Sequence, residues 1–136
     1  EVAEEERQRL FEAFAAAVRS RAADALAQVL AQDAVLLADG GGKVSAVPRP
    51  LHGREQVATA FIGFARLPGS RGWRLEPAQV NGLPGCLLFD ELDGGRLVQT
   101  IALAPSAQEP GRIGAIYVQR NPDKLRHVTA GPGHPS

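Results

Sequence analysis

The sequence predicts an α+β domain in which helices come first and antiparallel strands follow. Three observations lead to this class. Apolar residues near the N-terminus recur with helical spacing, short alternating runs fill the second half, and turns rich in glycine or proline separate those runs. A chain of 136 residues has the length of one domain and should bury roughly 68–70% of its unfolded surface. We therefore expect one domain over 1–128 and a Gly/Pro-rich tail over 129–136.

Three helices are expected in the first half of the chain. The first covers 4–18, where Leu10, Phe14 and Val18 recur on one face and three glutamates occupy the first turn, which the helix dipole favours. The other two are expected at about 23–31 and from Gly53 to the turn at 67–70. Each has an apolar face that needs a sheet or another helix to cover it.

Strands are expected where apolar and polar residues alternate between turns. Residues 33–39 form the first strand, the glycines at 40–42 end it, and 43–47 return as its hairpin partner. The prolines at 48 and 50 then stop the pairing, because proline donates no hydrogen bond to a ladder. Later strands are expected at 73–80, 86–89, 96–103 and 112–118, with turns at 81–85, 93–95 and 109–111.

Net charge, apolar runs and cysteine count indicate which partners and which cell compartment to expect. The chain has 15 basic and 15 acidic residues, which removes the simplest argument for a nucleic-acid or anionic-membrane surface. Its apolar runs are too short to span a bilayer, and we expect no signal peptide. The single cysteine, Cys86, cannot form an internal disulfide and is expected to be a buried thiol. We therefore expect a cytoplasmic protein.

Three segments resemble SnoaL-like proteins of the nuclear-transport-factor-like superfamily. Residues 50–57 resemble the start of the third helix in those proteins. The glycine-rich segment 39–43 and the Asn-Pro-Asp-Lys segment 121–124 together resemble the C-terminal SnoaL-like extension of extracytoplasmic-function RNA polymerase sigma factors, in the sigma-factor-J-like group. The resemblance covers about 11–128. It implies a cone in which three helices of the N-terminal half pack on a strongly curved antiparallel or mixed sheet.

The same resemblance implies a regulatory domain of a bacterial sigma factor. In that family the extension contacts the sigma-factor helical domains of the same polypeptide and modulates transcription initiation, so the RNA polymerase core is an indirect partner. The chain contains no methionine, not even at position 1, and we expect it to be a piece of such a longer polypeptide. We expect no catalytic residue, cofactor, metal, membrane or direct nucleic-acid contact, and a homodimer of the isolated domain is left open. The partner-contact residues implied are Asp39, Gly40, Gly41, Gly42, Lys43, Asn121, Pro122, Asp123 and Lys124.

Each of these two motifs also has a purely structural interpretation. Three glycines accept a wide hairpin turn at low cost, and Asn-Pro-Asp is typical of a chain reversal after a strand. We nevertheless predict that 39–43 and 121–124 lie close together at one end of the sheet. The first hairpin turns directly after the first motif begins, and the last strand ends just before the second motif.

The alternative function is a stand-alone small-molecule-binding protein or a cyclase- or isomerase-type enzyme. Such enzymes use a pocket carboxylate as a base and a second group to polarise a carbonyl. We expect only Asp39 and Glu76 to reach a pocket, with Trp73 and Tyr117 either lining it or packing in the core. The three histidines lack the spacing of metal ligands. The remaining acids considered fall at helix starts and turns: Asp24, Asp33, Asp90, Asp93 and Glu109.

Overall fold

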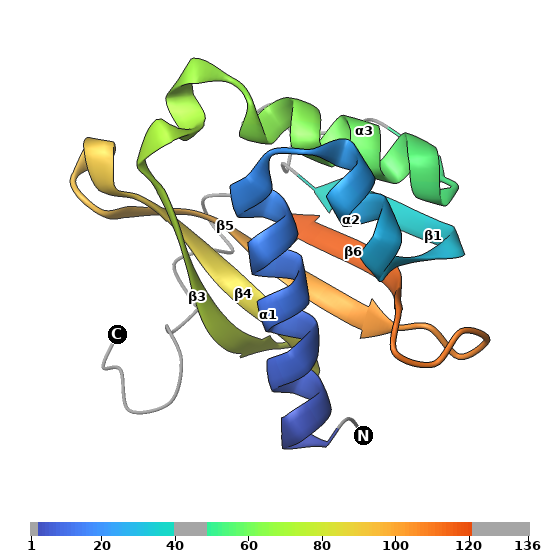
Figure 1. Ribbon diagram of the computed structural model, residues 1–136. Coiled ribbons are helices and arrows are strands. Elements are labelled where there is room, and N and C mark those ends of the chain that lie inside the picture. The colour runs from blue at the N-terminus through green and yellow to red at the C-terminus, as the bar shows by residue number, and fades with distance from the viewer. Residues whose placement is uncertain (1–2, 40–48, 121–136) are drawn as a thin grey trace.

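The computed structural model describes residues 3–39 and 49–120 and places three helices against one face of a six-stranded sheet (Figure 1). The helices are α1 (Glu4–Ser20), α2 (Ala23–Val29) and α3 (Arg54–Ala65), and two short 3-10 turns are η1 (Pro68–Gly72) and η2 (Glu91–Asp93). The strands are β1 (Leu30–Asp39), β2 (Leu51–His52), β3 (Trp73–Val80), β4 (Leu83–Asp90), β5 (Arg96–Pro105) and β6 (Ile113–Gln119). The predicted α+β class is confirmed.

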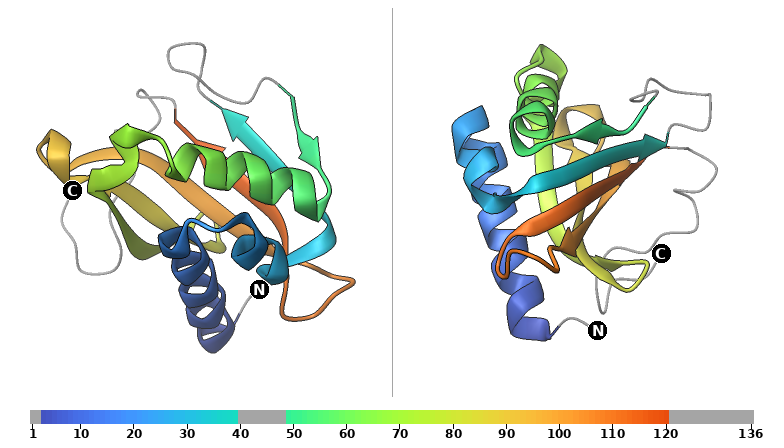
Figure 2. Two further views of the ribbon diagram at one scale, coloured as in Figure 1. Left: turned by 45° about the horizontal axis from the view of Figure 1, so that its top comes forward. Right: turned by 90° about the vertical axis from the view of Figure 1, so that its right-hand side faces the viewer.

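The sheet is mixed and strongly curved. Its strand order is β2-β1-β6-β5-β4-β3, with β1 and β6 parallel and every other neighbouring pair antiparallel. Figure 2 shows the helices on the concave side, with α1 crossing the sheet and α3 lying over its other half. This arrangement agrees with the predicted cone of three helices on a curved sheet.

Strands β1 and β4 each begin three residues earlier than predicted, and smaller differences occur at other boundaries. Strand β1 begins at Leu30, directly after α2 ends, so the second helix is shorter and the first strand longer than expected. Strand β4 begins at Leu83, because Asn81 and Gly82 alone make the turn after β3, with φ of 53° and 79°. Two residues with positive φ form the tight hairpin turn that suits the twist of antiparallel strands.

On the side away from β6, β1 pairs with β2, through Val35 opposite His52 and Leu36 opposite Leu51. The return strand predicted at 43–47 lies outside the described residues, as does the tail at 129–136.

The core lies between the helices and the concave face of the sheet. Phe14 of α1 meets Phe61 of α3 edge to face, with 5.3 Å between ring centroids, a geometry that aromatic pairs favour. Beneath the helices, Leu36, Ile101 and Ile116 from three strands are buried. These apolar contacts fix α3 over the sheet, and α3 in turn positions the candidate site.

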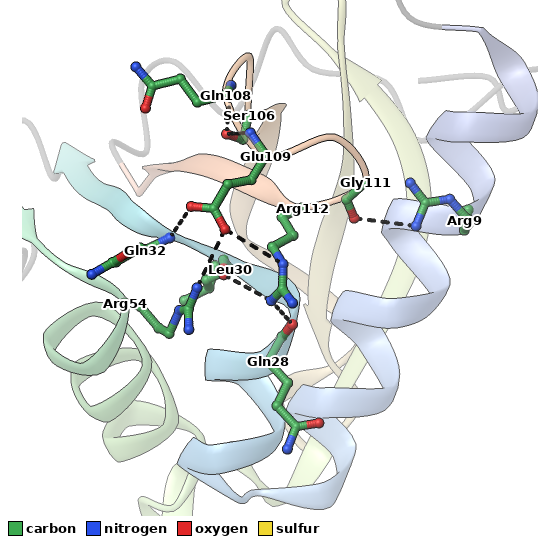
Figure 3. Close-up of polar contacts among 10 residues, drawn as sticks. All are labelled: Arg9, Gln28, Leu30, Gln32, Arg54, Ser106, Gln108, Glu109, Gly111 and Arg112. Carbon is green, nitrogen blue, oxygen red and sulfur yellow. Dashed lines mark hydrogen bonds and ion pairs between the residues drawn. The ribbon is translucent and has the colours of Figure 1, made fainter.

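A polar cluster ties the loop between β5 and β6 to the first half of the chain (Figure 3). The Glu109 carboxylate accepts a hydrogen bond from the Gln32 backbone N–H at 2.7 Å. It also lies 3.6 Å from Arg54 and 3.7 Å from Arg112. Arg112 in turn donates to the Gln28 carbonyl at 2.5 Å. Glu109 and Arg112 are paired with each other and with backbone, whereas the Nε of Arg54 is buried without a hydrogen-bond partner among the described residues. Because these contacts join the loop to β1, α2 and α3, we interpret the cluster as structural.

Candidate functional site

A cavity of about 450 Å³ lies between α3, η1 and the concave face of the sheet. Its volume falls within the range of roughly 300–1,000 Å³ that is typical of small-molecule sites. Strands β1, β3, β4, β5 and β6 contribute to its walls. The described residues that line it are Leu36, Ala38, Phe61, Phe64, Leu67, Ser70, Trp73, Asp90, Arg96, Val98, Gln99, Val118 and Arg120.

Helix α3 and the turn after it form an apolar wall and rim. Phe61 is almost fully buried and joins the cavity to the core, whereas Phe64, three residues later on α3, is 41% exposed. Leu67 follows the helix and is 55% exposed. The Ser70 hydroxyl holds this turn in place, because it lies 2.5 Å from the Ala65 carbonyl and 2.8 Å from that of Leu67. The cavity therefore opens past exposed apolar side chains.

A β-bulge shapes the opposite wall. Leu88 of β4 pairs with Gln99 of β5, but the next residue, Phe89, pairs with Leu97, which leaves Val98 as an extra residue. A bulge of this kind changes the direction in which nearby side chains point. Val98 and Gln99 are consecutive in the chain, yet both line the cavity.

Gln99 is the unusual polar group of this wall. It is only 6% exposed, and no hydrogen bond reaches its side-chain amide from any residue in 3–39 or 49–120. Its neighbours on the same face of β5, Ile101 and Leu103, are fully buried in the core. Buried polar groups usually have a partner, so the Gln99 amide is available to a molecule in the cavity.

Two charged groups of the cavity, Asp90 and Arg96, already make hydrogen bonds within the protein. Asp90 accepts a hydrogen bond from the Leu92 backbone N–H at 3.0 Å and thereby caps η2. Arg96 donates to Asp93 at 2.7 Å, and it also lies opposite Asp90 in the β4–β5 register. The sequence grouped Asp90 with the turn acids. The structure places it in the cavity wall because β4 continues as far as this residue.

Of the residues considered for a pocket, Trp73, Glu76 and Tyr117 do not share one. Trp73 lines the cavity. Glu76 is three residues further along β3 and therefore on the other face, where it pairs with Arg74. Tyr117 is 42% exposed and lines a separate hollow of about 150 Å³ with Leu37. Its neighbours on β6 face the helices, and alternation therefore directs Tyr117 away from them.

The two signature motifs fall largely outside the described residues. Gly40, Gly41, Gly42 and Lys43, and likewise Asn121, Pro122, Asp123 and Lys124, are not described. Asp39, however, is the last residue of β1, and its backbone lies opposite Gln119, the last residue of β6. The strands that lead into the two motifs therefore end side by side, at the same end of the sheet as the cavity.

Sequence reasoning missed Gln99, although a signal was present. Inward positions on β5 alternate from Leu103 through Ile101 to Gln99, so a single polar residue interrupts an apolar face. The bulge at Val98 then breaks the alternation, and the remainder of the strand gives no consistent pattern. A single glutamine at an inward position of an otherwise apolar strand face is the sequence feature that could have identified Gln99 as a candidate site residue.

Within 3–39 and 49–120, no group of three or more His, Cys, Asp or Glu side chains is arranged to hold a metal ion. In the same ranges, no helix combines the length and apolar character needed to cross a membrane.

No family model and no curated protein matches the chain, but solved structures do. The extracytoplasmic function sigma factor SigJ of Mycobacterium tuberculosis is 23% identical, with a TM-score of 0.66, over 88% of this chain and 44% of its own. A SnoaL-like protein of unknown function from Burkholderia thailandensis is 15% identical, with a TM-score of 0.63, over 87% of this chain and 97% of its own.

A candidate isomerase of the SnoaL-like family from Agrobacterium tumefaciens is 17% identical, with a TM-score of 0.55, over 84% of this chain and 96% of its own. The chain spans less than half of the sigma factor that it matches, and nearly the whole of the other two proteins. The curved sheet, the three helices and these neighbours agree: the chain has the NTF2/SnoaL-like fold.

Proposed function

We propose that this chain is the regulatory C-terminal domain of an extracytoplasmic-function sigma factor and modulates transcription initiation through contact with the sigma helical domains. The observation that carries the proposal is its likeness to 44% of a sigma factor of this class. The two segments that resemble signature motifs of such an extension add support. In this role the domain acts in the bacterial cytoplasm, with the RNA polymerase core as an indirect partner.

The geometry of the strand ends supports a contact surface. Asp39 and Gln119 end two adjacent parallel strands, so the strands that precede the two motifs end at the same end of the sheet. Each motif carries an Asp and a Lys, which suits a polar contact that forms and releases. Partner-facing charges of this kind contribute little to folding, since an exposed ion pair is worth about 0–1 kcal/mol.

The cavity supports binding over catalysis. Among the described residues that line it, Asp90 is the one carboxylate, and it already accepts a backbone N–H. A general base must reach the substrate proton it removes, and Glu76 and Tyr117 do not line this cavity. A regulatory domain does not need a catalytic base or a second group that polarises a carbonyl.

The test is transcription with and without the domain. RNA polymerase core would be combined with the full-length sigma factor or with a form that lacks these 136 residues, and run-off transcripts would be counted. We expect the two forms to differ by about 5-fold or more, the size of an ordinary coupling between sites. Lys43→Ala and Asp123→Ala should each reproduce part of the change without altering thermal unfolding of the domain.

Asp24→Ala is the matched control for Asp123→Ala, because Asp24 is an exposed acid on α2, away from the strand ends. It should leave transcription unchanged. Equal transcription by the full-length and truncated factors would rule out the regulatory role, and loss of folding in both motif variants would make the motifs structural.

A second candidate function is the binding of a small molecule. The specific observation that favours it is the cavity itself, whose mainly apolar wall includes the largely buried side chain of Gln99. The two functions are compatible, because the cavity and the ends of β1 and β6 lie at the same end of the sheet.

A further inference from the structure

We propose that a groove beside the C-terminal end of α1 binds a short acidic segment of a partner protein, and that the Arg21 side chain holds one of its carboxylates. The inference goes beyond the proposed functions, because it depends neither on the cavity under α3 nor on the ends of β1 and β6.

The groove lies where the C-terminal end of α1 faces the start of β3, the strand at one edge of the sheet (Figure 1). It has a volume of about 520 Å³. Its charged lining consists of Arg19, Arg21 and Arg74, and no acid in 3–39 or 49–120 lines it. Among the described residues, only Ser70 and Trp73 also line the cavity under α3. The groove is therefore a basic site in a chain with equal numbers of basic and acidic residues.

Two of the three arginines lack an acidic partner. Arg74 is paired with Glu76 and lies 3.0 Å from Glu91, so its charge is compensated. Arg19 and Arg21 are exposed, and neither forms an ion pair with an acid in the described ranges 3–39 and 49–120. The uncompensated positive charge of the groove therefore lies at the end of α1.

Arg21 has a backbone conformation that glycine adopts more easily. It follows the last residue of α1 with φ of 56° and ψ of 29°, in the left-handed region, where helices most often end on Gly or Asn. The other described non-glycine residue with positive φ is Asn81, and asparagine is more common than arginine in this region. A strained residue whose side chain the fold does not require points to a function of that side chain.

The hydrogen bonds between Arg21 and the other described residues use its backbone. Its N–H donates to the Val18 carbonyl at 3.1 Å, and its carbonyl accepts a hydrogen bond from the Arg66 Nε at 2.9 Å. Glycine could make both contacts, whereas the exposed arginine side chain adds a positive charge at the groove. The hydrogen bond from Arg66 also places a further guanidinium beside Arg21.

The rest of the lining is mainly apolar. Val18 and Ala65 are buried, while Trp73 and Leu75 are half-buried. Arginines bind carboxylates through parallel N–H donors, and clusters of them recognise acidic motifs. The apolar residues add a place for an apolar side chain next to the acid.

The open form of the groove favours a peptide over other anions. Its three arginines are exposed, whereas sites for small molecules enclose most of the ligand surface. Nucleic acid carries a charge on every phosphate and is bound by several basic side chains along its backbone. Two uncompensated arginines beside apolar residues instead suit one or two carboxylates next to an apolar side chain.

The probes are fluorescein-labelled peptides added to the whole chain, with binding followed by fluorescence anisotropy. The peptide GEELEEG carries acids around a leucine, GQQLQQG removes the charges, and GEEGEEG removes the leucine. We expect GEELEEG to bind at least about 5-fold more tightly than the other two, and more weakly at higher salt because the contact is exposed. Trp73 is the single tryptophan and lines the groove, so its fluorescence gives a second readout.

Arg21→Gly separates the side chain from the fold. It should weaken GEELEEG by about 5- to 10-fold, the loss of one exposed charge-assisted hydrogen bond. Its Tm should stay the same or rise, because glycine adopts the left-handed conformation without strain. Arg19→Gln should weaken GEELEEG by about 3-fold. The matched control is Arg49→Gln, the same exchange at an exposed residue that precedes β2 at the opposite edge of the sheet, and it should bind as the wild type does.

Equal binding of GEELEEG and GQQLQQG, or equal binding by Arg19→Gln and Arg49→Gln, would overturn the inference. A thymidine oligonucleotide that binds more tightly than GEELEEG, and is weakened by Arg21→Gly, would assign the groove to nucleic acid and overturn it too. If Arg21→Gly does not fold, the comparison of Arg19→Gln with Arg49→Gln still decides. Transcription by the full-length and truncated factors tests the regulatory role separately.

Discussion

The Cys86 thiol lies on β4 in the core and is fully buried. Burial raises its pKa above the ordinary value of 9.0, because the apolar surroundings disfavour the thiolate. Thiolate is the reactive form. We therefore predict that the native protein reacts very slowly with a thiol reagent such as 5,5′-dithiobis(2-nitrobenzoate) at pH 8, whereas the urea-unfolded chain reacts at the rate of a free cysteine.

The same thiol makes stability depend on pH in the alkaline range. Its pKa is higher in the folded state than in the unfolded state, so the native protein holds the proton more tightly. The stabilisation is fully present below pH 9.0 and is lost as pH rises above that value. The measurement is urea unfolding at pH 8 and at pH 10 for the wild type and Cys86→Ala. Rapid native labelling, or a wild-type loss between these pH values no larger than that of Cys86→Ala, would contradict buried Cys86.

Single side chains of the site were only partly predictable from sequence. Trp73, for which the sequence left both a pocket wall and the core open, lines the cavity. Glu76 and Tyr117 lie elsewhere. Alternation along a strand tells which residues share a face, but not which face the helices cover. For Gln99, alternation with Ile101 and Leu103 indicates an inward-facing side chain. The bulge at Val98 interrupts that alternation and obscured the position of Gln99.

Among the elements, the loop between β5 and β6 depends on Glu109. Its carboxylate joins the start of β1 to α3 through Gln32 and Arg54, and Arg112 completes the link to α2 (Figure 3). Glu109→Gln removes both ion pairs and weakens the charged hydrogen bond. We predict a loss of about 1–2 kcal/mol in the free energy of unfolding, measured by urea denaturation.

The control for this prediction is an exposed ion pair. Asp93 and Arg96 lie 2.7 Å apart but are 61% and 60% exposed at their side chains. Asp93→Asn should cost at most about 0.5 kcal/mol. If the two variants lose equal stability, the cluster around Glu109 has no special role in holding the loop.

The helices were more predictable than the strand boundaries. The period of apolar residues on α1 and α3 is set by local geometry, and both helices begin and end near the predicted positions. The start of β4 was predicted three residues late, because Pro84 and Gly85 suggested a turn. Only the structure shows that Gly85 is needed inside the strand, since an added Cβ would come within 2.2 Å of the Ile101 carbonyl oxygen.

At the scale of the whole molecule, the order of the strands places the ends of β1 and β6 next to each other, and the proposed contact surface depends on this placement. That β1 and β6 are parallel neighbours could not be derived from sequence, because it joins segments about 80 residues apart and pairing over such separations leaves no local signal. The expectation that 39–43 and 121–124 lie together stays a prediction. The described residues add that the strands leading into them end at Asp39 and Gln119, opposite each other.

The proposed contact surface can be located directly by NMR. Sigma helical domains would be expressed separately, without label, and added to this chain labelled with ¹⁵N. We expect saturable shifts concentrated in amides of 36–43 and 117–124, with little change near Leu30 and Ile113 at the opposite end of the β1–β6 pair. Absence of saturable shifts, or shifts centred on the Leu30 and Ile113 end, would contradict the proposed contact surface.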